Sequence, residues 1–192
     1  MEQSLKRRGG PDSLVIISGH DRSLIGKKLG AIATERKETA VEAALEIIQG
    51  GGAGVASFNM QDADLENFMR QDFVMTGSDG SEGHPRKYGT FPRKLRLYVR
   101  EKKVITLPFA IHASSALTAQ TLRLTDRGLL RTGYYADVIA FDPATVADQS
   151  TYEHPDVLPT GVKYVIVNGM IAVDGGKYTG ILAGHALRPG RH

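Results

Sequence analysis

The residues Phe73-Val74-Met75-Thr76-Gly77-Ser78-Asp79-Gly80 carry the information that decides the fold. Residues 73–76 are apolar or β-branched and predict a buried strand, and glycines at 77 and 80 follow it closely. A carboxylate just beyond the carboxyl end of a buried strand lies where α/β barrels place catalytic groups. Asp79 is therefore a candidate metal ligand and proton acceptor. Spacing alone, however, favours an ordinary Asp-Gly turn with a solvated carboxylate.

The sequence before this stretch alternates between strands and helices. Short apolar runs at 13–17 and 55–58 predict two further strands. Helices are expected from a Ser23 cap to about residue 34, from a capping box of Thr39 and Glu42 to Gly50, and from Asp62 onward. Helical spacing predicts inward faces made of Ile25, Leu29, Ile32 and Ala33, then Val41, Ala44, Leu45 and Ile48, then Leu65, Phe68 and Met69. The order of these elements is typical of parallel α/β structure.

The sequence after residue 80 changes character near residue 125. A loop is expected over 81–91, then a helix from Pro92 whose core face is Leu95, Tyr98 and Val99, and another helix over 106–122. Strands are predicted at 136–141, 162–167 and 170–173. Asn168-Gly169 and the turn at 174–176 are hairpin signals. We therefore expect the last third of the chain to be antiparallel β structure.

Composition excludes several classes of protein. The chain has 192 residues, a net charge of +3, and no cysteine, which rules out disulfides and thiolate-bound metal. The basic segment 93–103 is interpreted as an amphipathic helix with a solvated face, in preference to an RNA-binding surface. We expect no nucleic-acid partner. The chain also lacks an apolar run of about 18 residues and a hydrophobic signal core, so we expect no membrane association and a cytoplasmic location.

Arg86 is a second candidate, seven residues after Asp79 in the sequence His84-Pro85-Arg86. A guanidinium binds a carboxylate through two parallel hydrogen bonds, so Arg86 suits a substrate that ends in one. A surface arginine is the alternative. The histidines have no metal-site spacing. We interpret His84 as a loop residue rather than a pocket donor, and His112 as packed or half-exposed, while His20 could line a barrel mouth.

Many stretches together match one family. They are Gly52–Gly54, Ser57–Met60, Val74–Gly80, His84–Arg93, Leu97–Lys102, Asp126–Gly128, Gly133–Val138, Phe141–Val146 and Val165–Gly169. In these stretches the chain resembles the D-aminoacylase family, the N-acyl-D-amino-acid deacylases of the amidohydrolase superfamily. The block from His84 to Arg93 is the most specific part of the resemblance.

The resemblance implies an α/β fold. Residues 1–125 would be the C-terminal part of a (β/α)8 amidohydrolase barrel, and residues 126–192 part of a small antiparallel β-sandwich. It also implies hydrolysis of an N-acyl-D-amino acid to a carboxylate and a D-amino acid, with zinc polarising the scissile carbonyl. Asp79 matches the family's metal-binding aspartate and general base, which then protonates the leaving amine. Arg86 matches the arginine that holds the substrate's α-carboxylate.

The chain departs from the family in its metal ligands. Asp79 is the only family ligand that it contains, whereas a stable catalytic zinc site uses three protein ligands. We therefore expect the isolated chain to bind no zinc stably and to be inactive unless a missing N-terminal half complements it. The alternative is a free-standing, non-catalytic module that forms a homo-oligomer through open strand edges.

Overall fold

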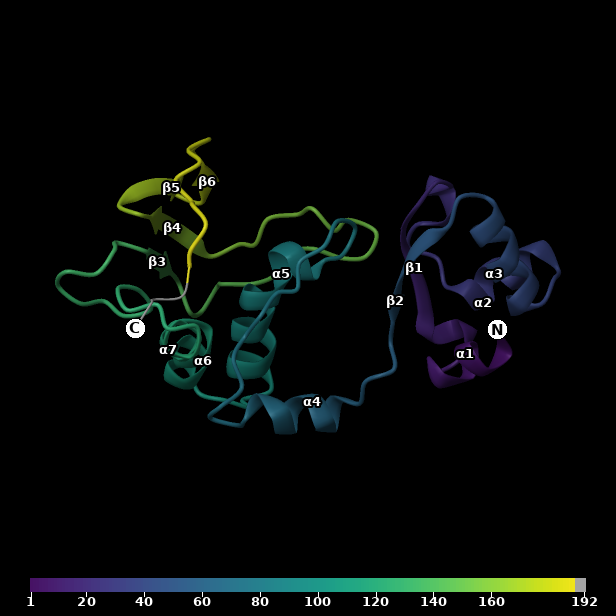
Figure 1. The fold of residues 1–192 in the computed structure, drawn as a ribbon, viewed down its shortest axis with the longest axis horizontal. Coiled ribbons are helices and arrows are strands. Elements are labelled where there is room, and N and C mark those ends of the chain that lie inside the picture. The colour runs from purple at the N-terminus through teal and green to yellow at the C-terminus, as the bar shows by residue number, and fades with distance from the viewer. Residues whose placement is uncertain (189–192) are drawn as a thin grey trace. The chain divides into compact units, whose positions relative to one another are not determined.

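The computed structural model describes residues 1–188, which belong to two compact units (Figure 1). Unit 1 comprises Met1–Leu65, Gly80–Lys87 and Ser150–Val157, and unit 2 comprises Glu66–Asp79, Tyr88–Gln149 and the chain from Leu158 onward. The β-rich part predicted for 126–192 includes residues 189–192, which lie outside the described residues. None of the helices within residues 1–188 has the length and apolar character needed to cross a membrane.

Unit 1 is built on two strands, β1 (Leu14–Gly19) and β2 (Ala53–Ser57), at the positions predicted for them. They pair in the antiparallel direction, with a register shift between Ile16 and Ser18. The expectation of parallel pairing is therefore wrong here. The reason is that two helices, α2 (Leu29–Arg36) and α3 (Ala40–Gln49), connect the strands and pack against each other. A single crossover helix would allow parallel strands, whereas an outgoing and a returning helix leave the second strand running backwards.

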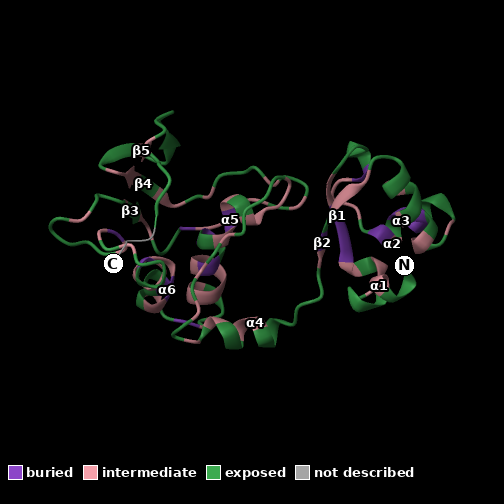
Figure 2. Ribbon diagram, in the orientation of Figure 1, coloured by how far each residue is buried: buried purple, intermediate pink, exposed green. Residues whose placement is uncertain are grey.

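The core of unit 1 lies between β1 and these two helices (Figure 2). Its buried residues are Leu14, Ile16, Leu24, Leu29, Ile32, Ala33 and Ala43. The predicted face of α2 is confirmed at Leu29, Ile32 and Ala33, but that of α3 is wrong at Leu45 and Ile48, which are 42% and 58% exposed. Helix α3 is apolar around most of its circumference, so spacing could not select the side that packs through its alanines.

Helix starts follow local side-chain chemistry in unit 1. The capping box is confirmed, since the Thr39 side chain accepts from the Glu42 amide at 3.2 Å and Glu42 Oε2 accepts from the Thr39 amide at 2.8 Å. The Ser23 cap is wrong. Ser23 lies in a 3-10 turn, η2 (Arg22–Leu24), that is capped by Asp21, and α2 begins only at Leu29. Three further short elements complete the order up to residue 69, namely α1 (Glu2–Arg7), η1 (Pro11–Ser13) and α4 (Asp62–Met69).

The helices that follow residue 85 differ in extent from those predicted. Helix α5 (Arg86–Arg93) begins inside the predicted loop and continues directly as a π-helix, η3 (Lys94–Glu101), so that Pro92 lies within the helix rather than at its start. The helix starts early because the His84 ring accepts a hydrogen bond from the Arg86 amide, which satisfies a donor at the first turn. The predicted helix over 106–122 is confirmed as α6 (Leu107–Ser114) and α7 (Ala116–Thr121), which are separated at Ser115.

The strand predicted at 73–76 does not form. The segment has no regular secondary structure, and no strand among residues 1–188 pairs with it. A strand needs a partner for its backbone groups, and an apolar run cannot by itself provide one. The inward placement of Phe68 on α4 is also wrong, since this side chain is 59% exposed.

Antiparallel β structure in the last third of the chain is confirmed. Strands β3 (Val138–Phe141), β4 (Val162–Val167), β5 (Met170–Asp174) and β6 (Lys177–Tyr178) form one sheet in sequence order. Asn168 and Gly169 join β4 to β5 with φ values of 50° and 80°, the left-handed pair that a tight hairpin requires. The described chain therefore has the helices and strands of an α/β protein.

Candidate functional site

Asp79 ends the irregular segment 73–79 of unit 2. The residue is exposed and has a φ of 44°, in the left-handed region that few residues other than glycine enter. Aspartate is among the residues that tolerate this conformation best. Its carboxylate is therefore reachable from solvent at the end of the segment, as a proton acceptor must be.

Thr76 fastens this segment to the helices of unit 2. Its amide donates to the Ala113 carbonyl of α6 at 2.9 Å. Its hydroxyl oxygen lies 2.5 Å from Lys94 Nζ and 3.1 Å from Ser114 Oγ. Lys94, the first residue of the π-helix, is only 8% exposed, and burial lowers the pKa of its ammonium group. Lys94 and the adjacent residues Ala113 and Ser114, from two separate parts of the chain, thus contact Thr76, three positions before Asp79.

The arginines of segment 93–103 hold another part of unit 2. Arg96 Nε donates to Asp148 Oδ1 at 2.7 Å, and Arg100 Nη1 donates to the carbonyls of Pro143 and Val146 at 3.0 and 2.9 Å. The Asp148 side chain is only 7% exposed. The prediction of a solvated basic face is therefore wrong for Arg96 and Arg100, whereas Arg93, Lys102 and Lys103 are exposed as predicted. Helical spacing identified the charged positions but could not show that the chain at 143–148 covers Arg96 and Arg100.

Arg86 belongs to unit 1, where the loop 80–87 runs against β1. Gly83 has a φ of 74°, and a Cβ atom there would lie 2.3 Å from the Ile17 carbonyl oxygen, so only glycine allows this approach. Arg86 is half-buried, with its amide 3.1 Å from His84 Nδ1 and its Nη2 3.5 Å from Ser81 Oγ. The half-buried Arg86 departs from the alternative of a surface arginine, and its substrate-binding role stays a prediction.

The histidines within the described part of the chain take structural or exposed positions. His84 is a loop residue, as interpreted, and its ring packs edge-on against Tyr152 at 5.1 Å between centroids, with the Tyr152 hydroxyl 3.4 Å from Nε2. His20 and His112 are exposed. Within residues 1–188, no group of three or more histidine, cysteine, aspartate or glutamate residues could hold a metal ion. Asp79 therefore belongs to no such group within this part of the chain.

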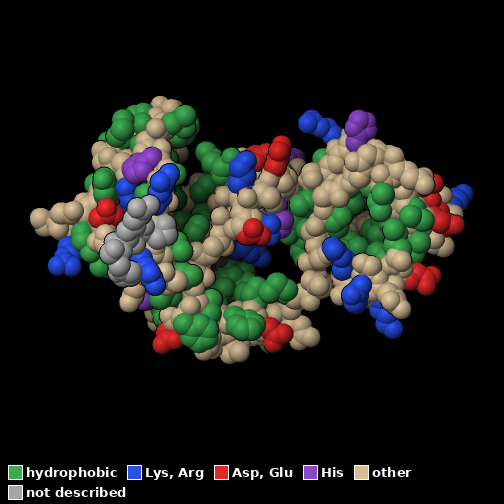
Figure 3. All heavy atoms as spheres, viewed as in Figure 1, with side chains coloured by type: hydrophobic (Ala, Val, Ile, Leu, Met, Phe, Trp, Pro, Cys, Tyr) green, Lys and Arg blue, Asp and Glu red, His purple; other side chains and the backbone are tan. Residues whose placement is uncertain are grey.

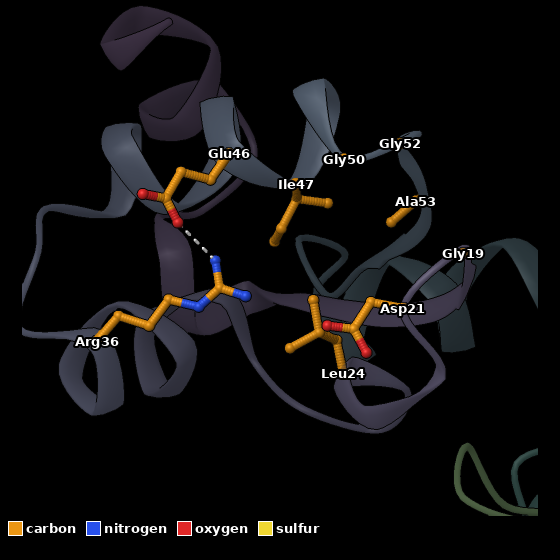
Figure 4. Close-up of a pocket in the computed structure, with 9 residues that line it drawn as sticks. All are labelled: Gly19, Asp21, Leu24, Arg36, Glu46, Ile47, Gly50, Gly52 and Ala53. Atoms are coloured by element: carbon orange, nitrogen blue, oxygen red, sulfur yellow. Dashed lines mark hydrogen bonds and ion pairs between the residues drawn. The ribbon is translucent and has the colours of Figure 1, made fainter.

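A pocket of about 230 Å³ lies within unit 1 (Figure 4). Arg36 and Glu46 face each other across it, with Arg36 Nη1 3.0 Å from Glu46 Oε2. Hydrogen bonds from Ser23 hold the pKa of the Asp21 carboxyl below its usual value. The residues that line this pocket do not include Asp79 or Arg86. Its charged groups already bind one another, so the pocket is not assigned a role in catalysis.

One cluster in unit 2 was missed by sequence reasoning. Arg127 is 8% exposed, forms an ion pair with Asp137, and donates through Nη2 to Asn168 Oδ1 at 2.6 Å. The Asn168 amide in turn donates to Asp137 Oδ1 at 2.8 Å, and the Arg127 guanidinium lies 4.2 Å above the Tyr135 ring. These residues lie in three of the stretches that carry the family resemblance. Their shared role is to join the loop after α7 to β3 and the β4–β5 turn.

Comparison with known proteins identifies relatives of the expected kind. The model described as "Amidohydrolase family" matches residues 69–173. The D-aminoacylase of Alcaligenes xylosoxydans xylosoxydans is 38% identical over 168 residues, which cover 85% of this chain and 34% of the relative. The N-acyl-D-aspartate deacylase of the same organism is 40% identical over 142 residues, which cover 72% of this chain and 28% of the relative.

Solved structures agree with these relatives. A crystal structure of D-aminoacylase superposes with a TM-score of 0.82 at 36% identity, covering 91% of this chain and 37% of the other. The N-acyl-D-glutamate deacylase of Bordetella bronchiseptica was solved with zinc and a phosphonate that mimics the tetrahedral intermediate. It superposes with a TM-score of 0.77 at 31% identity, and the match covers 93% of this chain and 39% of the other. The chain thus spans about a third of the length of the relatives that it matches.

Proposed function

Because this chain belongs to the amidohydrolase family, we propose that it is the part of an N-acyl-D-amino-acid deacylase that supplies the general base. The single observation that carries the proposal is the exposed Asp79, held in a left-handed conformation at the end of a fastened segment. The relatives of the chain are deacylases of N-acyl-D-amino acids. We extend their reaction, hydrolysis of an amide to a carboxylate and a D-amino acid, to the whole protein that includes this chain.

Two residues of this chain have roles in the proposed reaction. The Asp79 carboxylate accepts a proton from the attacking water and then donates the same proton to the leaving nitrogen. One carboxylate thus serves first as the base and then as the acid. The Arg86 guanidinium binds the α-carboxylate of the substrate and so orients the acyl group.

The zinc of the relatives is not matched by a complete ligand set in residues 1–188. A catalytic zinc uses about three protein ligands, and Asp79 is one carboxylate. The residues of this chain do not by themselves fit the metal, so no step of the reaction is assigned to it here. We propose that other residues of the whole enzyme supply the remaining ligands, and that Asp79 completes the site.

We retain the two-part division of the chain as a proposal. Residues 1–125 would contribute the last strands and helices of a (β/α)8 barrel, and residues 126–192 the β-rich part of a small composite sandwich. The sheet of β3 to β6 supports the second part. The match of residues 69–173 to the amidohydrolase family supports the first.

The 192-residue polypeptide is expected to bind no stoichiometric zinc and to release no amine from N-acetyl-D-amino acids. The physical reason is the lack of enough ligands, since one exposed carboxylate competes poorly with water for a divalent ion. Metal analysis of the purified chain, together with a ninhydrin assay for free amine, checks both expectations. Zinc bound at one per chain with measurable turnover would overturn the proposal that other residues complete the site.

A graft tests the proposed function itself. Residues of this chain replace the matching segment of the Alcaligenes D-aminoacylase, in which 38% of the aligned positions are already identical. The graft should hydrolyse N-acetyl-D-amino acids and leave the L-enantiomers intact. A folded graft that binds zinc but hydrolyses neither enantiomer would contradict the deacylase proposal.

A second candidate function, self-association as a non-catalytic module, is favoured by one observation. Large apolar side chains are exposed on both units, including Leu45, Ile48 and Phe58 in unit 1 and Phe68 and Phe73 in unit 2. Apolar side chains are visible on the face shown in Figure 3. Exposed apolar surface of this kind is covered in most proteins by further chain or by a partner.

The isolated chain is therefore expected to sediment with a mass above the 20.8 kDa of one copy. Replacing Leu45 and Ile48 by lysine should shift the equilibrium toward the monomer, because charges on an apolar contact must be desolvated. Sedimentation equilibrium at several concentrations measures the change. A 20.8 kDa species at every concentration would exclude this candidate.

A further inference from the structure

Lys94 is a buried cation whose position no catalytic role yet explains. Its side chain is 8% exposed, and among residues 1–188 its hydrogen bond is to the Thr76 hydroxyl. A methionine of similar length would fill the same space without removing a charge from water. Stability by itself therefore does not require an ammonium group here.

The partner of Lys94 lies in the segment that ends at Asp79. That segment has no neighbouring strand within the described residues, so a ladder of backbone hydrogen bonds does not hold it. Thr76 holds it instead, through its amide to Ala113 and through its hydroxyl to Lys94 and Ser114. Ser114 Oγ also donates to the Ala110 carbonyl at 2.7 Å, which ties the group to the body of α6.

The site of Lys94 in the helix is also unusual. It is the first residue of the π-helix Lys94–Glu101, which directly continues α5. π-Helical turns are rare and occur frequently at functional sites, because the widened turn changes where a side chain points. In this helix the arginines at 96 and 100 bind the chain at 143–148. Lys94 alone of the basic residues at 93, 94, 96 and 100 is bonded to the segment that carries Asp79.

We infer that Lys94 is a positioning residue. It binds the Thr76 hydroxyl and thereby restricts the backbone between Thr76 and Asp79. The inference rests on the proposed role of Asp79 as the general base. A base must be placed accurately against the water that it deprotonates, and a short, charged hydrogen bond three residues earlier restricts the segment. Lys94 itself touches neither Asp79 nor a reacting atom in this assignment.

Amide hydrogen exchange in the 192-residue chain tests the inference without any need for activity. Lys94→Met should raise the exchange rate of the Thr76 amide, which donates to the Ala113 carbonyl, about tenfold or more, because a charged hydrogen bond that restrains Thr76 is lost. Exchange at 165–167 in β4 should stay unchanged. Lys94→Arg, which keeps a cationic donor, should retain most of the protection, and Thr76→Val should reproduce the effect of Lys94→Met.

Two matched variants separate positioning from general packing. Thr76→Ser keeps the hydroxyl and should leave exchange near the wild-type rate. Lys103→Met removes an exposed lysine that follows the same helix and should change nothing. Unchanged exchange of the Thr76 amide in Lys94→Met, or an equal increase at 165–167, would overturn the inference.

The graft supplies the second readout. Lys94→Met should lower kcat about tenfold or more with KM within about twofold, since the substrate still binds but the base is misplaced. Lys94→Arg should recover most of kcat. A Lys94→Met graft with unchanged kcat would overturn the catalytic part of the inference. An unmodified graft without activity would count against the proposed function, while the exchange rates would still decide whether Lys94 holds the segment.

Discussion

Replacing Asp79 by asparagine in the graft should lower kcat by about a thousandfold, within the 10²–10⁴ range attributed to a general base. Asparagine has nearly the same size and also tolerates a left-handed φ, so the backbone at this position should be preserved. Its amide cannot accept a proton from water at neutral pH or deliver one to the leaving nitrogen. Initial rates of amine release, measured with zinc content on the same samples, determine the change.

The control for Asp79→Asn is Asp72→Asn, which neutralises another exposed aspartate of unit 2 and should leave kcat within about twofold of the unmodified graft. Arg86→Gln provides a contrast. It should raise KM about tenfold or more for substrates with an α-carboxylate, and much less for acyl amines that lack one. An Asp79→Asn graft that keeps more than about a tenth of the activity would reject the general-base assignment.

Arg127→Met should lower the free energy of unfolding of unit 2 by about 2 kcal/mol. The loss of one partner from a fully buried ion pair costs about 3–5 kcal/mol. A smaller value is expected because the Asp137 side chain is 34% exposed and can recover part of its hydration. The variant also loses the hydrogen bond to Asn168 and the contact with the Tyr135 ring. Urea unfolding followed by circular dichroism measures the change.

The matched control is Arg131→Met, because Arg131 is an exposed arginine beside an aromatic ring, with no ion pair among residues 1–188. It should change the free energy of unfolding by less than about 0.5 kcal/mol. Equal destabilisation by the two variants would show that any loss of positive charge in this region has the same effect, and would reject the specific cluster of Arg127, Asp137 and Asn168.

The free energy of unfolding should depend on pH through the same cluster of Arg127, Asp137 and Asn168. Burial acts to raise the pKa of the Asp137 carboxyl, but hydrogen bonds from the Asn168 amide and Arg127, with the Arg127 charge, bring it below its usual value. A carboxyl with a lowered pKa in the folded state stabilises the fold above the unfolded pKa of about 3.9. That contribution is lost as the pH falls through the lower, folded pKa. The acid loss of stability should therefore be shallower in Arg127→Met.

Sequence signals succeeded where the structure depends on neighbouring residues. The Thr39 and Glu42 capping box and the Asn168-Gly169 turn need only side chains within a few positions of each other, and both are confirmed. The family resemblance is also confirmed, because it depends on residue identities at many positions. The roles of Asp79 and Arg86, which were inferred from that resemblance, stay predictions.

Errors arose where an element has to find a distant partner. The apolar run 73–76 has the composition of a strand, but a strand exists only when another chain segment accepts its hydrogen bonds. Helix α3 presents apolar residues on most sides, and only its contact with α2 decides which of them are buried. The charges of segment 93–103 indicated a solvated face until residues 143–148 were found against it.

The sequence by itself determined the family of the chain, the Thr39 and Glu42 capping box, the Asn168-Gly169 turn, and the two residues that are candidates for chemistry. Only the tertiary structure decided that β1 and β2 run in opposite directions, that Lys94 is buried against Thr76, and that Arg127 joins Asp137 to Asn168. The physical reason is that burial and pairing are properties of contacts between residues far apart along the chain. Composition and spacing describe each segment separately, and they cannot specify which segment it will meet.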